Sequence, residues 1–243
     1  METFSKLDIF ATKGTEYLFV IGYLMILIIF WRIANKQFRI KEQALNVIGN
    51  LSANVLKIPQ GLFFNKNHTW AFLEKTGIAK VGMDDFFQHV TGEVEFYNLK
   101  NPGDIIYKGD LLTEINQGEK KLRIFSPISG KIVETNPVLY EDPKIVNDDP
   151  YEKGWLYNIK PSSWMQDTKS YFIAESATQW ATKELERFKD FLSGRAVKDQ
   201  ISEQPIVLLQ DGGELRDNVL SELPNEVWID FQKEFLNIAQ KKK

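Results

Sequence analysis

Residues 101–110 read NPGDIIYKGD, residues 126–132 read SPISGKI, and residues 148–155 read DDPYEKGW. Each run places glycine or proline between short apolar stretches, which is the pattern of tight turns between β-strands. Similar turn signals recur about every 8–12 positions from residue 62 onward, as in a small β-sandwich or flattened barrel. We therefore expect residues 62–164 to form one mainly β domain.

The apolar runs of this region predict several strands and one short helix, the helix at Asp84–Val90. We also expect special backbone geometry at Gly130 and Gly154, where a β-branched residue would destabilise the fold if φ is positive. The strands are expected at Trp70–Leu73, Ile78–Val81, Val94–Leu99, Leu111–Ile115, Leu122–Phe125 and Lys131–Glu134.

Motifs along residues 62–164 together resemble those of the glycine cleavage H-protein family, which has the biotinyl/lipoyl-domain fold. They are FNKNHTW at 64–70, GIAKVG at 77–82 followed by Asp84, GEVEF at 92–96, and the three runs quoted above. The resemblance implies a flattened β-barrel or sandwich of the hammerhead type. It also implies a carrier, because the family's lipoyl-lysine arm passes an aminomethyl group and electrons between partner enzymes.

The position of the family's arm lysine holds a different residue in this chain. In the family, that lysine stands eight residues before the proline of the Ser-Pro turn and ten residues after the glycine of the preceding Lys-Gly turn. Counting back from Pro127 and forward from Gly109 leads to Glu119 both times, and Asn116 stands where the family has a glutamate. A carboxylate cannot form the amide that would join lipoate or biotin to the protein.

Two lysines follow Glu119, and Gly118 indicates that a hairpin turn is still present. We expect Lys120 and Lys121 to form an exposed, solvated hairpin end, because a shift of one residue turns a side chain to the other side of a hairpin. No cofactor is then expected. The alternative is a Lys120 that carries covalent lipoate in an altered turn.

An uncharged run, YLFVIGYLMILIIFW, occupies residues 17–31 and continues to residue 34 around Arg32. As a helix it reaches roughly 27 Å, close to the ~30 Å hydrocarbon core of a bilayer. A buried core helix fits poorly, because the apolar residues cover every side of this helix. A signal peptide also fits poorly, because no small-residue cleavage site follows the run promptly. We expect a single transmembrane helix at residues 17–34, with residues 1–16 as a short extracytoplasmic N-terminus.

Basic residues follow this predicted span at Arg32, Lys36, Arg39 and Lys41. The positive-inside rule therefore places the body of the protein in the cytoplasm and the span in the cell inner membrane. Residues 35–61 are expected to be a juxtamembrane helix and linker, with helical spacing over 36–58 and a stop at Pro59.

Residues 165–243 are expected to form a helical extension. An apolar stripe from Phe172 to Leu192 predicts a long amphipathic helix that ends at Gly194. Further helices are expected around Leu215–Leu220 and after Pro224, and their aromatic residues are expected to be core.

The composition argues against several functions. A net charge of −3 provides no overall attraction to nucleic acid, and the absence of cysteine removes disulfides and thiolate sites. The two histidines, His68 and His89, are too few for a histidine metal cluster, and neither has a nucleophile beside it. We expect His68 to be a satisfied structural side chain and His89 a capping or surface residue. No catalytic residue and no metal ligand are assigned, and the chain is not expected to be an enzyme.

The sequence thus predicts a membrane-tethered, non-catalytic H-protein-like domain that acts as an adaptor or accessory subunit without a lipoyl arm. Its expected partners are the membrane and a protein, with a membrane redox complex as the host. The alternative is a true lipoyl carrier modified on Lys120.

Overall fold

The computed structural model describes residues 17, 19–28, 30, 50–51, 56–198 and 215–237. The chain divides into two units, Met1–Gly49 and Asn50–Lys243. In the first unit the described residues are helical, apolar and exposed. No helix among the described residues is both long and apolar enough to cross a membrane. The predicted span at 17–34 includes undescribed residues, and the predicted N-terminus at 1–16 and most of the predicted helix at 36–58 also lie outside the described residues.

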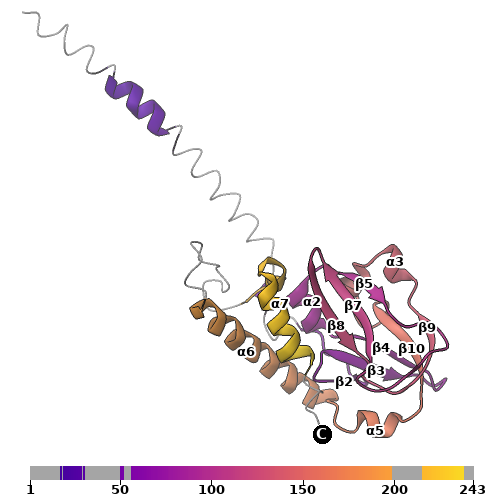
Figure 1. The fold of residues 1–243 in the computed structure, drawn as a ribbon. Coiled ribbons are helices and arrows are strands. Elements are labelled where there is room, and N and C mark those ends of the chain that lie inside the picture. Colours follow the sequence, from indigo (N-terminus) through magenta and orange to yellow (C-terminus); the bar gives the residue numbers. More distant parts are fainter. Residues whose placement is uncertain are drawn as a thin grey trace, which may run out of the picture. The chain divides into compact units, whose positions relative to one another are not determined.

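Two antiparallel sheets build the β domain of the second unit (Figure 1). One has six strands in the order β2-β3-β4-β10-β9-β6, and the other has three in the order β5-β7-β8. All six predicted strands are present with small shifts at their ends, while β2, β6 and β10 were not singled out in the sequence. The strands are β2 (Phe63–Phe64), β3 (Thr69–Leu73), β4 (Ala79–Met83), β5 (Glu95–Asn98), β6 (Ile105–Ile106), β7 (Leu111–Gln117), β8 (Lys120–Phe125), β9 (Gly130–Thr135) and β10 (Trp155–Pro161).

The predicted short helix is confirmed as α2 (Asp85–Thr91). Asp84 begins it as the N-cap, since its side chain accepts a hydrogen bond from the backbone N–H of Phe87 at 2.9 Å. Three further short helices follow along the domain: α3 (Val138–Glu141), α4 (Ile145–Asp148) and α5 (Trp164–Thr168).

The domain core centres on side chains that face inward from both sheets. Trp70 is fully buried, and its indole N–H donates to the carbonyl oxygen of Met83 at 2.8 Å. Gly82 makes room for that indole, because a Cβ at this position would lie 2.6 Å from the Trp70 ring. The alternation of buried and exposed residues in β8 follows the period of a strand with one face on the core.

The C-terminal extension packs against the α2 side of the β domain (Figure 1). Its long helix, α6 (Ala174–Lys198), lies beside α7 (Asn225–Phe231) and the π-helical turn η2 (Gln232–Leu236). Phe188 of α6 contacts Phe231 and Phe235, with ring centroids 5.8 and 5.7 Å apart. All three rings are fully buried, so the expectation that these aromatic residues form core is confirmed.

Several local expectations are wrong. Gly194 does not end α6, which runs on to Lys198. Asn50–Leu51 form strand β1 rather than helix, and they pair with β11 (Leu215–Arg216), where a second helix was expected. After β11, the 3-10 helix η1 (Val219–Glu222) is the only part of that predicted helix that the described residues contain.

Gly130 and Gly154 do not have positive φ. Their constraint is instead the closeness of neighbouring backbone. A Cβ at Gly130 would collide with the carbonyl oxygen of Lys160 on β10, and a Cβ at Gly154 would lie 2.7 Å from the carbonyl oxygen of Asp149.

Candidate functional site

The tip of the β7–β8 hairpin is the position where the family resemblance places its modified residue. Gln117 pairs with Lys120, which leaves Gly118 and Glu119 as a two-residue turn. Gly118 has φ +61°, and Glu119 is not among the residues with positive φ, which fits a type II′ turn with glycine first. Glu119 is exposed, so the outermost side chain of the hairpin is a carboxylate.

Lys120 lies on the inward-facing side of β8, in the same alternation as the buried Leu122 and Ile124. Its Nζ donates a hydrogen bond to the carbonyl oxygen of Ser221 at 2.6 Å and lies 5.5 Å from the centre of the Trp228 ring. Burial of this side chain lowers the pKa of Lys120. The expected exposed hairpin end therefore applies to Lys121, but it is wrong for Lys120, which is partly buried.

The free edge of β8 is covered by a side chain from η2. The backbone N–H of Arg123 donates to the Gln232 side-chain oxygen at 2.6 Å, and the Gln232 amide nitrogen donates to the Arg123 carbonyl oxygen at 3.1 Å. The Gln232 amide thus substitutes for a neighbouring strand and protects an edge that would otherwise present unpaired backbone groups. Residues 215–237, hereafter the C-terminal segment, hold the hairpin at two points.

A cavity of about 300 Å³ lies beside the turn and is lined in part by Glu93, Glu95, Asn116 and Gln117. The Gln117 amide nitrogen donates to the carbonyl oxygens of Thr91, at 3.1 Å, and Glu93, at 2.8 Å, which ties the hairpin to the end of α2. Both strands of the hairpin are therefore anchored to the rest of the domain near its tip, β7 through Gln117 and β8 through Lys120.

His68 is a buried ion-pair residue. Its Nδ1 is 2.9 Å from an oxygen of Asp84, and its Nε2 is 3.3 Å from an oxygen of Glu184 on α6. Burial alone would lower the pKa of His68, but Asp84 and Glu184 outweigh it and raise the pKa to about 9. For the acidic Glu184 the signs are reversed: burial alone would raise its pKa, but His68 and Arg187 outweigh burial and lower the pKa. The expected structural role of His68 is therefore confirmed.

His89 was expected to cap a helix or face solvent, and the structure gives it a larger role. Its Nδ1 lies 2.7 Å from Asp217 of the C-terminal segment, and its Nε2 lies 3.4 Å from Asp85 of α2. Burial alone would lower the pKa of His89, but the carboxylates of Asp217 and Asp85 outweigh burial and raise the pKa to about 9. The spacing of four between Asp85 and His89 was a readable signal for half of this cluster.

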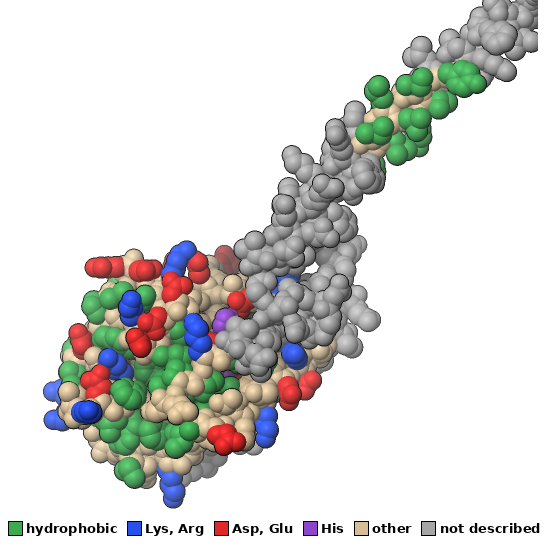
Figure 2. All heavy atoms as spheres, turned by 180° about the vertical axis from the view of Figure 1, so that it is seen from behind, with side chains coloured by type: hydrophobic (Ala, Val, Ile, Leu, Met, Phe, Trp, Pro, Cys, Tyr) green, Lys and Arg blue, Asp and Glu red, His purple; other side chains and the backbone are tan. Residues whose placement is uncertain are grey.

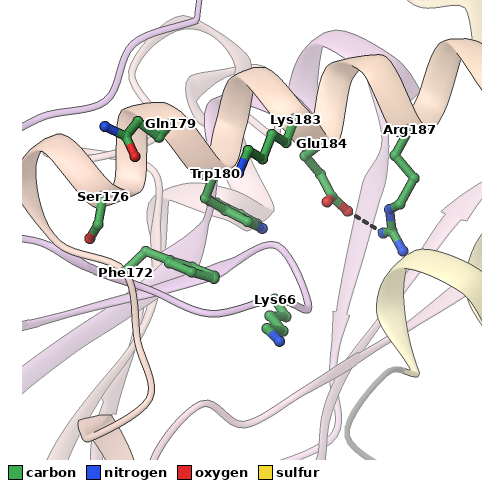
Figure 3. A pocket seen from close by; sticks show the side chains of 8 residues that line it. All are labelled: Lys66, Phe172, Ser176, Gln179, Trp180, Lys183, Glu184 and Arg187. Carbon is green, nitrogen blue, oxygen red and sulfur yellow. Dashed lines mark hydrogen bonds and ion pairs between the residues drawn. The ribbon is translucent and has the colours of Figure 1, made fainter.

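A second concave site runs along α6, where a cleft of about 490 Å³ opens between this helix and the turn that precedes β3 (Figure 3). The rings of Phe172 and Trp180 stack at 5.2 Å with 8° between their planes. The cleft was not recognised in the sequence, although its helical members share one face of a 3.6-residue period. Its lining residues are Lys66, Phe172, Ser176, Gln179, Trp180, Lys183, Glu184 and Arg187.

Comparison with known proteins identifies the β domain. The glycine cleavage H-protein family matches residues 62–184, so the match extends past the expected boundary at residue 164 into α6. The chain is 32% identical over 124 residues to the "Probable glycine cleavage system H protein" of Thermococcus gammatolerans, covering 51% of this chain and 92% of that protein. It is 37% identical over 106 residues to the H protein of Psychrobacter cryohalolentis, covering 44% and 84%.

A crystal structure of a glycine cleavage system H protein from Mycobacterium marinum is similar at 25% identity with a TM-score of 0.43, covering 52% of this chain and 98% of that chain. The family match spans half of the chain and includes the β7–β8 hairpin. Through residues 62–184, this chain belongs to the glycine cleavage H-protein family.

Proposed function

We propose that this protein is a carrier of the H-protein type and that Lys120 is the residue that takes a lipoyl group. Members of the family are carriers rather than enzymes, and the match runs through the hairpin on which the family holds its arm. Glu119 at the tip cannot be acylated, so the neighbouring amine is the candidate. The observation that carries this choice is the partial burial of Lys120, which lowers its pKa and increases the share of neutral amine, the form that attacks an activated carboxyl group.

The contact between Lys120 and the C-terminal segment is a small barrier to modification. Releasing the amine breaks one hydrogen bond to Ser221, worth about 1.5–3 kcal/mol for a charged donor. It also moves the ammonium group away from the Trp228 ring, whose centre lies 5.5 Å from it in the structure. When attached, the lipoyl group would supply the aminomethyl and electron transfer that the family resemblance implies.

A second candidate function is the adaptor without an arm. Glu119 occupies the tip, and both Lys120 and the β8 edge are engaged by the C-terminal segment, which favours a fixed docking module. Apolar side chains gather over a broad part of the surface seen in Figure 2. Exposed large apolar residues of the β domain, which a protein partner could cover, include Tyr97, Leu99, Ile105, Tyr107 and Tyr140. The names of the relatives favour the carrier over this adaptor.

We further propose that the N-terminal unit anchors the protein in the cell inner membrane with the H-protein domain in the cytoplasm, where a membrane redox complex is its host. The supporting observations are the exposed apolar side chains of the described helix residues between 17 and 30, and the basic residues that follow in the sequence. We expect the protein to stay in the membrane fraction after alkaline carbonate extraction. We also expect a protease to reach the H-protein domain from the cytoplasmic side only. Release by alkaline carbonate would contradict the anchor.

The mass of the hairpin peptide Asn116–Arg123, taken from protein purified out of its native membrane, separates the two functions. A lipoyl-sized increment located on Lys120 by fragmentation supports the carrier. An unmodified peptide from cells whose other lipoyl proteins are fully modified contradicts the carrier and favours the adaptor.

A further inference from the structure

The cleft along α6 has the composition of a binding site for a small anion. We propose that it binds an organic anion with a flat apolar part, of the aryl phosphate or aryl carboxylate class. The cleft is built by α6 and the turn around Lys66, and it shares no lining residue with the cavity beside the hairpin turn. The proposal therefore holds whether or not Lys120 is acylated.

Two lysine side chains in the cleft are not paired with an acidic group among the described residues. Lys66 and Lys183 are exposed, and in the described part of the chain neither ammonium group has a hydrogen-bond or ion-pair partner. They come from opposite walls, Lys183 from the helix and Lys66 from the turn below it (Figure 3). Two lysines that line one cavity favour an anionic ligand.

The remaining charged residues of the cleft are already engaged. Glu184 forms ion pairs with His68 and Arg187, so its carboxylate is neutralised by protein groups. The Arg187 guanidinium also donates to the carbonyl oxygen of Glu234 at 3.3 Å and lies 4.0 Å from the centre of the Phe235 ring. Arg187 therefore closes one end of the cleft and joins it to the C-terminal segment.

The apolar part of the cleft is a rigid pair of rings. Trp180 is only 8% exposed and packs against the His68 ring at 5.4 Å, which fixes its orientation. Phe172 stacks on Trp180, is only half-buried and lines the cleft, so part of its ring is open to a ligand. The volume of about 490 Å³ is within the range of small-molecule sites. A flat ring placed against Phe172 would have its charged substituent within the field of the two lysines.

Isothermal titration of phenyl phosphate into the full-length protein tests the proposal, in an uncharged detergent and at low ionic strength. We expect saturable binding with one site per chain, and a dissociation constant about tenfold higher in Lys66→Gln/Lys183→Gln because two charge contacts are lost. The matched control is Lys75→Gln/Lys153→Gln, which removes the same charge from two other exposed positions and should bind as the unmodified chain does. Gln179→Glu, which adds a negative charge to the wall, should also weaken binding.

Three results would overturn the proposal. The first is the absence of saturable binding, and the second is equal weakening in the control variant, which would indicate a general charge effect. The third is inorganic phosphate binding as tightly as phenyl phosphate, since the rings of Phe172 and Trp180 would then contribute nothing. All substituted positions are exposed, so we expect every variant to have the same melting temperature as the unmodified chain. Equal melting temperatures would show that a loss of binding is not caused by a loss of fold.

Discussion

The ammonium group of Lys120 donates a hydrogen bond to the carbonyl oxygen of Ser221 at 2.6 Å, across 101 residues of sequence. This contact joins the hairpin on which the H-protein family holds its arm to a C-terminal segment that lies beyond the family match. Access to the amine of Lys120 therefore depends on residues outside the H-protein domain.

Lys120→Arg is expected to abolish lipoyl attachment, because a guanidinium remains protonated and does not form the amide. Lys121→Arg is the matched control and should keep the modification, since Lys121 faces the opposite side of β8. Intact mass and hairpin peptide mass from the native host provide the measurement. An increment that survives in Lys120→Arg and disappears in Lys121→Arg would reverse the assignment.

Gln232→Ala should destabilise the protein by roughly 1–2 kcal/mol, because two hydrogen bonds to the backbone of Arg123 are lost at a partly solvated edge. Urea unfolding gives the free energy, and hydrogen exchange at the Arg123 amide should become faster. Lys233→Ala, at a neighbouring exposed position, should change the free energy of unfolding by less than about 0.5 kcal/mol. Unchanged protection of the Arg123 amide in Gln232→Ala would show that the edge is covered by something else.

His68 makes stability depend on pH in the alkaline range. Its folded pKa of about 9 is above the ordinary value of 6.5, so the stabilisation is fully present below 6.5 and is lost as pH rises through about 9. Deprotonation removes the positive charge of the His68 imidazole, which pairs with Asp84 on one side and Glu184 on the other. Asp84 then loses its ion pair with His68, while Glu184 keeps its ion pair with Arg187.

The free energy of unfolding should therefore fall between about pH 7 and pH 10, and the slope should be smaller in His68→Gln. His89 contributes in the same direction, since its pKa is also raised to about 9 between Asp85 and Asp217. The double variant His68→Gln/His89→Gln should have the flattest profile of the set. A profile for the double variant as steep as that of the unmodified chain would contradict the histidine origin of the effect.

Two glycine-to-alanine changes are expected to have opposite signs. Gly82→Ala should destabilise by about 1–3 kcal/mol, because its Cβ would collide with the buried Trp70 indole. Gly194→Ala should stabilise by roughly 0.5–1 kcal/mol, since Gly194 lies within α6 and a Cβ there meets nothing within 4 Å. Thermal unfolding of the two variants gives both signs, and a destabilised Gly194→Ala would indicate that α6 needs flexibility at that position.

Local patterns predicted much of the β domain. Alternation of apolar residues located the strands, Asp84 marked the start of α2, and Gly118 marked the hairpin turn. Each of these signals depends on the backbone preferences of a few neighbouring residues, so it can be read without knowing what the segment packs against. The counts from Pro127 and Gly109 that identify Glu119 are equally local.

The misplaced elements show where local signals are too weak. Gly194 predicts a helix end, but the cost of one glycine within a helix is only about 1 kcal/mol, and α6 continues through it to Lys198. Asn50–Leu51 pair with Leu215–Arg216, and nothing in either segment alone indicates the other.

The sequence by itself determined the family, the β architecture and the presence of Glu119 in the β7–β8 turn, because these depend on residue identity and on spacing along the chain. Only the tertiary structure decided that Lys120 is held by Ser221, that Gln232 covers the edge of β8 and that His89 pairs with Asp217. These contacts join residues 101, 109 and 128 positions apart. Each contact consists of one or two polar interactions, which are too weak to assemble the fold alone. The aromatic core between α6, α7 and α2 holds the segments close together, and no periodicity in the sequence records that closeness.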